Sequence, residues 1–196
     1  MHKIALLTLI VSAVPLWCQE IHDFRDITDV TILGAERNDH IGFHMADLGD
    51  INADGYADVF LFRSLGEYDP GEPTAYILLG GADIPQEIDL LSPPAGIVRI
   101  TESFDQLRGT GLGDFNGDGI DDLLLSDRRA SPDGVPNGGE VLILYGNEQL
   151  PEEINFQNPG LAEVRIRGVR PGGYLAFGVC GAGDVNGDGL MDALLG

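Results

Sequence analysis

The sequence predicts an all-β protein built from repeated units of four short antiparallel strands. An acidic nine-residue segment, D-x-N-x-D-G-x-x-D, occurs at residues 50–58, 114–122 and 184–192, so its copies begin 64 and 70 residues apart. Repetition at such intervals is typical of an architecture of repeated structural units. Short apolar runs such as VLILY at residues 141–145 flank the acidic segments. After residue 18, no stretch of helical length has the apolar spacing of an amphipathic helix.

The first eighteen residues have the pattern of a secretory signal peptide. Residues 1–3 are short and positively charged, and residues 4–17 are apolar except for Thr8, Ser12 and the turn-forming Pro15. This run is too short for a comfortable membrane span, and a polar segment follows it. We expect residues 1–18 to be removed after Cys18 and the protein to be secreted. The alternatives are a lipoprotein that begins at Cys18 and a buried N-terminal strand or helix.

Each acidic segment, called an Asp loop below, is expected to join short strands. Upstream lie β-like segments that begin at Val30, Ile97 and Val164, and Gly- or aromatic-rich segments then lead into the loops. Apolar runs follow the loops at residues 59–62, 123–126 and 193–196, and further strands are expected within 74–81 and 139–147. One unit is therefore strand, Asp loop, strand, turn, strand, connection, strand. Middle strands that are apolar on both faces are typical of β-propeller blades, which pack face to face.

The Asp loops have the composition of a site for a hard divalent cation such as Ca²⁺, which takes about six to eight oxygen ligands. Side-chain oxygens at loop positions 1, 3 and 5 converge when the chain curls tightly, and Gly at position 6 permits that curl. Position 7 then offers its carbonyl and position 9 a carboxylate. An EF-hand is excluded because Leu61, Leu125 and Leu195 stand where it requires Glu. Metal-free Asn/Asp/Gly hairpin turns are the remaining alternative.

These units resemble FG-GAP repeats, the blades of the N-terminal propeller of integrin α-subunits and of many secreted bacterial proteins. The third unit has Phe177-Gly178, then residues 181–183 (GAG), then its Asp loop. The second unit has LRG at 107–109 in place of Phe-Gly, and the first is degenerate over 41–50. The resemblance covers roughly residues 24–196, and residues 19–196 are expected to hold two full FG-GAP units and the start of a third.

The resemblance also implies structural Ca²⁺ within each blade, at about three sites. Asp121 adjoins the second loop, but the repeat supports only Asp122 as a ligand there. The predicted ligands of the three sites are Asp50, Asn52, Asp54, Tyr56 (carbonyl) and Asp58; Asp114, Asn116, Asp118, Ile120 (carbonyl) and Asp122; and Asp184, Asn186, Asp188, Leu190 (carbonyl) and Asp192.

Composition and charge narrow the class of protein. The formal net charge is −21, with 32 acidic and 11 basic residues, so no basic face is expected to replace the counterions of nucleic acid. The residues Arg165, Arg167 and Arg170 are expected to lie on one solvated strand face. Two cysteines cannot form a disulfide framework, and Cys180 is expected to be a small buried residue.

No catalytic constellation stands out in the sequence. The serines at positions 64, 103 and 126 lack a G-x-S-x-G context. His40 and His44 have the spacing of a zinc pair on a helix, but they lie where the repeat predicts a turn and an inner strand, and no H-E-x-x-H is present. We therefore expect no enzymatic activity from these residues; a catalytic part could lie elsewhere in a longer gene product.

The function expected from the sequence is a secreted calcium-binding propeller that serves adhesion or the binding of a protein or carbohydrate ligand. The long Gly/Pro-rich connections at 63–74 and 127–140 are the candidate ligand loops. The alternative is an accessory propeller domain of an exported hydrolase or lyase whose catalytic part lies outside this chain. A cell-surface spacer is a third possibility. The strand expected at 193–196 would lack partner strands, so we expect these residues to be the front of a longer protein.

Overall fold

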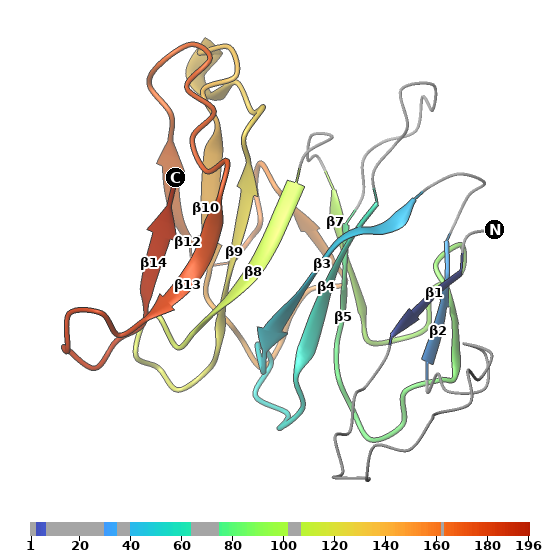
Figure 1. The fold of residues 1–196 in the computed structure, drawn as a ribbon. Coiled ribbons are helices and arrows are strands. Elements are labelled where there is room, and N and C mark those ends of the chain that lie inside the picture. The colour runs from blue at the N-terminus through green and yellow to red at the C-terminus, as the bar shows by residue number, and fades with distance from the viewer. Residues whose placement is uncertain (1–2, 7–29, 35–39, 64–74, 102–106, 162) are drawn as a thin grey trace, which may run out of the picture.

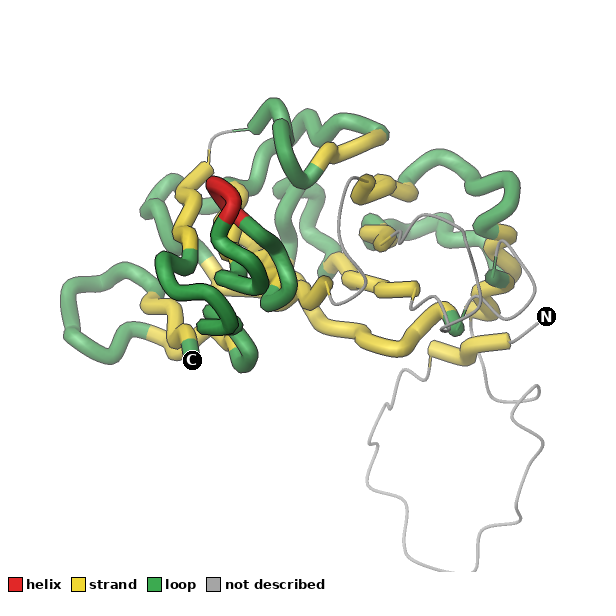
Figure 2. Tube along the Cα trace, turned by 90° about the horizontal axis from the view of Figure 1, so that it is seen from above, coloured by secondary structure: helices red, strands yellow, loops and turns green. Residues whose placement is uncertain are grey.

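The computed structural model describes residues 3–6, 30–34, 40–63, 75–101, 107–161 and 163–196. This part of the chain is all-β, as predicted: its strands form four sheets, and a single short 3-10 helix, η2 (Pro132–Gly134), lies among them. Figure 1 shows the sheets standing side by side. Seen from above, they follow one another along the molecule, with the two labelled chain ends on opposite sides (Figure 2). Within the described ranges, no helix is long and apolar enough to cross a membrane.

The first sheet carries the first Asp loop. Its antiparallel strands are β3 (Ile41–Gly49), β4 (Asp58–Arg63), β5 (Ala75–Leu78) and β7 (Ile97–Thr101), paired in chain order. The Asp loop joins β3 to β4. The strand that begins at Ile97 lies upstream of the second loop in sequence, yet it pairs with β5 and completes the first sheet.

The second sheet repeats this arrangement. Its antiparallel strands are β8 (Leu107–Gly113), β9 (Asp122–Asp127), β10 (Glu140–Leu144) and β12 (Glu163–Arg167), with the second Asp loop between β8 and β9. The third loop joins β13 (Val179–Gly183) to β14 (Asp192–Leu195), which pair with each other. The strands expected after each loop are therefore confirmed. The segments at Val30, Ile97 and Val164 are strands as expected, but none of them enters a loop: the Gly-rich segment before each loop is the strand that does so.

Two three-residue strands link neighbouring sheets. β11 (Glu153–Asn155), from the connection between β10 and β12, pairs in parallel with β7 of the first sheet. β6 (Glu87–Asp89), from the connection between β5 and β7, pairs in parallel with β2 (Val30–Leu33). The segments PQEID at 85–89 and PEEIN at 151–155 are a second internal repeat that contains these strands. The sequence expectations did not include this link, although the repeated P-x-E-I is a signal for it.

β2 also pairs antiparallel with β1 (Lys3–Leu6), which falls inside the predicted signal peptide. Residues 7–29 lie outside the described residues, and with them the expected cleavage site. The signal peptide therefore stays a prediction.

The core lies between the sheets because their middle strands are apolar on both faces. Phe60 and Phe62 of β4 belong to the buried cluster that Leu123 and Leu125 of β9 enter from the second sheet. Leu61, which points to the opposite face of β4, packs with Ile32 and Ile88 in another cluster. The same alternation in β9 and β10 places Leu124, Val141 and Ile143 against β13 and β14. Face-to-face packing of neighbouring sheets, as expected from the sequence, is confirmed.

Glycines in β8 allow the first and second sheets to approach closely. A Cβ at Gly109 would lie 2.6 Å from Cγ of Phe60, and a Cβ at Gly111 would lie 2.8 Å from the Leu48 carbonyl oxygen. Both distances are too short for a real contact, so the Gly-rich composition of this strand follows from the packing of Phe60 and Leu48 against its backbone.

Two sequence expectations are wrong. Arg165 is not a solvated side chain: it is only 12% exposed, and its Nη1 donates to Oε1 of buried Glu140 at 3.0 Å. The neighbouring strand β10 supplies this partner, which the sequence of β12 alone does not reveal. Cys180 is exposed rather than buried. Successive side chains of a strand point to opposite faces, and Gly181 is the residue of β13 that faces Leu112 of β8.

Candidate functional site

The three Asp loops lie at the same end of their sheets, the lower end in Figure 1. Each loop joins the first strand of its sheet to the second. The backbone curls tightly in each, and glycine occupies the positions with positive φ except at Ala53. Position 6 has φ of 89°, 93° and 91° at Gly55, Gly119 and Gly189. At position 4 the second and third loops also have glycine, whereas the first has Ala53 with φ of 58°.

In the first loop, the polar side chains converge on the backbone of the curl. Oδ1 of Asp50 accepts a hydrogen bond from Asp54 N–H at 3.0 Å, and its Oδ2 accepts one from Gly55 N–H at 2.8 Å. Oδ1 of Asn52 also accepts from Asp54 N–H, at 3.2 Å. Oδ1 of Asp54 accepts from Tyr56 N–H at 2.9 Å. Positions 1, 3 and 5 therefore lie around one turn of the chain, where they accept hydrogen bonds from its backbone.

The second and third loops have this arrangement and one further hydrogen bond, from position 4 to position 1. Position 1 accepts from the N–H groups of positions 4, 5 and 6, position 3 accepts from position 5, and position 5 accepts from position 7. The donor–acceptor distances are 2.7–3.1 Å in both loops, for Asp114, Asn116 and Asp118 and for Asp184, Asn186 and Asp188. The three loops thus share the hydrogen bonds that positions 5, 6 and 7 donate.

The carboxylate at position 9 has a different role from the others. Asp58 is fully buried; its Oδ2 accepts from Ile51 N–H at 2.9 Å and its Oδ1 from Gly80 N–H at 2.7 Å. Asp122 is equally buried and accepts from the corresponding N–H groups of Phe115 and Gly146. This side chain therefore ties the start of its own loop to the segment after the third strand of the sheet.

Burial dominates the electrostatics of position 9 in the first and second loops. It raises the pKa of Asp58 to about 6, against the opposing effect of the hydrogen bonds from Gly80 and Ile51. The charges of Asp54 and Asp50 raise it further. Burial raises the pKa of Asp122 in the same way, and the charge of Asp118 adds to the effect.

The donor set of each loop fits a hard cation: three carboxylates, one amide oxygen and a backbone carbonyl. A carboxylate has about four lone-pair sites on its two oxygens, so even Asp114 and Asp184, which accept three N–H groups each, retain capacity for a cation. Among the described residues, no group of three or more His, Cys, Asp or Glu side chains is arranged so that it could hold a metal ion. The carboxylates face backbone N–H groups instead, and calcium binding stays a prediction.

The other candidates from the sequence lie in different places. His44 belongs to β3, as the inner-strand expectation requires, and its Nε2 lies 2.9 Å from the carbonyl oxygen of Gly109. Most of the candidate ligand loop at 63–74 lies outside the described residues. The connection at 127–140 lies at the end of the sheets opposite the Asp loops (Figure 1). It is held by backbone hydrogen bonds from Gly168, Tyr174 and Leu175.

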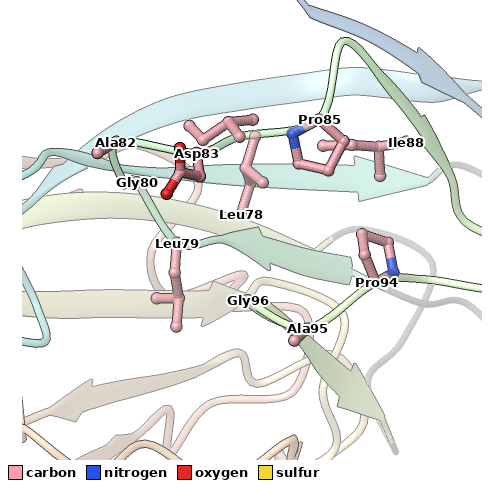
Figure 3. Close-up of a pocket in the computed structure, with 12 residues that line it drawn as sticks. Leu78, Leu79, Gly80, Ala82, Asp83, Pro85, Ile88, Pro94, Ala95 and Gly96 are labelled. Carbon is pink, nitrogen blue, oxygen red and sulfur yellow. The ribbon is translucent and has the colours of Figure 1, made fainter.

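A pocket of about 300 Å³ lies beside the first sheet, in the connection from β5 to β7 (Figure 3). Leu78, Ile88 and Pro94 give it apolar walls, and Asp83 is the one charged residue among the twelve that line it. Gly80, which donates to Asp58, is also in its wall. A single carboxylate without a partner base or nucleophile in the wall does not form a catalytic group.

Comparison with known proteins assigns no family to this chain. No protein-family model matches this chain, and no curated protein matches it in sequence.

Proposed function

We propose that this protein is a secreted calcium-binding propeller of the FG-GAP type that serves adhesion or ligand binding, with Ca²⁺ as a structural ion. The observation that carries the proposal is the equivalence of the three Asp loops. Each lies at the same end of its sheet, between the first and second strands. In all three, position 1 accepts from the N–H groups of positions 5 and 6, position 3 accepts from position 5, and position 5 accepts from position 7. An isolated polar turn would not repeat in this way on three successive sheets.

The ion would be held by the side chains at positions 1, 3, 5 and 9 and by the carbonyl at position 7. Bound there, Ca²⁺ would neutralise carboxylates that otherwise repel one another within a tight turn. In the first loop, the repulsion concerns Asp50, Asp54 and Asp58, whose mutual effect raises the pKa of Asp58. Because Asp58 also anchors the loop to Gly80, a cation at this site would stabilise the whole end of the sheet.

The sheets are proposed to be propeller blades. Two observations support this. The first and second sheets each contain four antiparallel strands in chain order, to which the first adds the parallel strand β11, and the middle strands bury both faces against neighbouring sheets. A radial array of such sheets is the propeller architecture. The connection at 127–140, together with 168–175, would offer a surface for a protein or carbohydrate ligand at the end away from the calcium sites.

Calcium titration tests the proposal directly. Isothermal calorimetry of the chelator-treated chain should show about three Ca²⁺ sites, and thermal melting should show stabilisation that grows with Ca²⁺ concentration. Binding to the folded state alone raises its stability by about 2.7 kcal/mol at a hundredfold excess over Kd. Variants Asp54→Ala, Asp118→Ala and Asp188→Ala should each remove one site. If millimolar Ca²⁺ neither binds nor raises the melting temperature, the proposal is wrong.

The sequence of the full gene product distinguishes an accessory domain of an enzyme from an adhesion protein. A catalytic motif after residue 196 would favour an exported hydrolase or lyase, and further Asp loops would favour a complete propeller. Secretion is tested by mass spectrometry of the mature N-terminus, which should begin after Cys18. Such cleavage would remove β1, while β2 would keep its parallel partner β6.

A further inference from the structure

Asp121 connects the second sheet to the first Asp loop by hydrogen bonds. It stands at position 8 of the second loop, outside the predicted ligand set. Its Oδ2 accepts a hydrogen bond from Asp50 N–H at 2.9 Å, and its own N–H donates to the Asp50 carbonyl at 3.3 Å. Asp50 is position 1 of the first loop. The second sheet therefore holds the residue at which the first loop begins.

Close packing against Gly49 restricts the position of the Asp121 side chain. A Cβ at Gly49 would collide with the Asp121 carboxylate, so the absence of a side chain there is what admits the contact. Gly49 also has φ of 75°, a conformation that favours glycine. Nearby, Asn147 N–H donates to the Ile51 carbonyl at 2.9 Å. Positions 1 and 2 of the first loop are thus both held by residues of the second unit.

The second loop lacks this hydrogen bond from its neighbour. Its equivalent contact comes from Met191, position 8 of the third loop, which lies over Gly113 just as Asp121 lies over Gly49. A Cβ at Gly113 would lie 3.0 Å from Cγ of Met191. A methionine side chain fills the space but is at most a weak acceptor. The chain therefore contains a natural pair of equivalent positions, one with a carboxylate and one without.

We infer that Asp121 is a positioning residue for the cation site of the first loop and raises the affinity of that site above that of the second. The inference rests on the proposed function. Two effects act in the same direction. The hydrogen bond orders Asp50 before a cation arrives, which reduces the ordering cost of binding. The fourth carboxylate also adds negative charge beside the site.

Terbium(III), which binds in place of Ca²⁺, gives a readout specific to the first loop. A tyrosine beside a bound lanthanide sensitises its emission, and position 7 is Tyr56 in the first loop but Ile120 and Leu190 in the others. Tyr56→Leu introduces the residue found at position 7 of the third loop. It should abolish the Tb³⁺ emission, which would show that the emission comes from the first loop. Titration with Tb³⁺ and displacement by Ca²⁺ then measure the affinity of this site in the 196-residue chain.

Asp121→Met, which introduces the residue found at this position in the third loop, should weaken Tb³⁺ binding at the first loop by about tenfold or more. Asp121→Asn keeps an acceptor oxygen without the charge and should weaken it less. The difference between these two variants separates orientation from charge. Melting temperatures in chelator report any loss of folding stability separately from the affinity.

The reciprocal variant, Met191→Asp, tests whether a carboxylate at position 8 of the third loop increases the Tb³⁺ affinity of the second loop. In a Tyr56→Leu, Ile120→Tyr background, the emission reports on the second loop. Met191→Asp should then raise Tb³⁺ affinity there several-fold, because the new carboxylate can accept from Asp114 N–H. A role of Asp121 in folding alone would lower the melting temperature of Asp121→Met but would leave this gain absent.

The outcomes distinguish the inference from the function on which it rests. Wild-type binding at the first loop, with no weakening in Asp121→Met and no gain in Met191→Asp, would overturn the inference alone. Wild type without Tb³⁺ emission or Ca²⁺ displacement would overturn the proposed function and the inference with it. If Asp121→Met does not fold, the Met191→Asp comparison decides.

Discussion

The carboxylate of Asp122 accepts hydrogen bonds from Phe115 N–H and from Gly146 N–H, each at 2.8 Å. Phe115 lies at the start of the second Asp loop, and Gly146 follows the third strand of the same sheet. One buried side chain therefore joins two segments that are well separated in sequence. Asp58 makes the same connection in the first sheet. In the first and second sheets, position 9 is thus a structural anchor whether or not the loop binds a cation.

Replacement of this anchor should destabilise the fold. Asp122→Ala would leave the N–H groups of Phe115 and Gly146 without their acceptor, and unsatisfied buried donors cost about 1–3 kcal/mol each. We expect a loss of about 2–4 kcal/mol in the free energy of unfolding, measured by urea denaturation in chelator. Asp118→Ala, at the exposed position 5 of the same loop, is the matched control. Equal losses in the two variants would contradict the anchor role.

The raised pKa of Asp58 predicts how the metal-free chain responds to pH. The pKa of about 6 in the folded chain lies above the ordinary aspartate value of 3.8, so the folded chain binds the proton more tightly than the unfolded chain. The stability contributed by this proton is fully present below about pH 4 and is lost as pH rises through about 6. Acidification from about pH 7 to pH 5 should therefore stabilise the chelated wild type relative to Asp58→Asn.

Denaturation curves of the two proteins at several pH values measure this difference. The Asp58→Asn side chain does not titrate, so effects of other groups cancel in the comparison. A difference that shrinks on acidification would mean that the folded state lowers the pKa of Asp58 instead.

The Asp loops and the strands beside them were predictable because each depends on a pattern of residues that are close together in the sequence. The Asp loops follow from the spacing of Asp, Asn and Gly, and strands such as β4 and β10 follow from apolar runs bounded by turn residues. Even the burial of both strand faces is visible in runs such as 141–145. Residues that contact their own loop, such as Asp50 and Asp54, could therefore be placed together from their spacing alone.

Features that depend on neighbouring strands were not predictable in the same way. Arg165 alternates with apolar residues and looks solvated until Glu140 of β10 is placed beside it. Asp121 and Met191 stand at the same loop position, and the sequence does not say what each of them contacts. Pairing partners distant in sequence set the direction and environment of such side chains, and one sequence does not contain that register.

The first Asp loop contains a strained residue that the other loops avoid. Ala53 has φ of 58°, whereas Gly117 and Gly187 occupy the equivalent position with φ of 81° and 79°. Ala53→Gly should raise the free energy of unfolding by about 0.5–1 kcal/mol, since relief of the left-handed conformation exceeds the entropy cost of glycine. Gly117→Ala should lower it by a similar amount. Urea denaturation of both variants measures whether the free energy of unfolding changes in opposite directions. Destabilisation by Ala53→Gly would contradict the expected relief of strain.

Close packing between the first two sheets depends on Gly109. Phe60 is fully buried and its ring lies against the backbone of this glycine, so an added methyl group requires the ring or β8 to move. Gly109→Ala should cost about 1–3 kcal/mol, the usual range for overpacking a core. Gly81→Ala adds a methyl group in open space and is the control. Similar thermal denaturation of the two variants would mean that the sheets can separate without loss.

The short strand β11 holds the second unit against the first sheet through Ile154. Ile154 is fully buried and belongs to the core shared by both sheets, while its backbone pairs with Ile100 of β7. Ile154→Ala should cost about 2–5 kcal/mol and Ile154→Val about 0.5–1.5 kcal/mol. Glu152→Ala, exposed two residues earlier, should change little. Hydrogen exchange should also accelerate at Arg99, whose N–H donates to the Glu152 carbonyl at 2.9 Å. Unchanged exchange at Arg99 in a destabilised Ile154→Ala protein would show that β7 and β11 remain paired without this side chain.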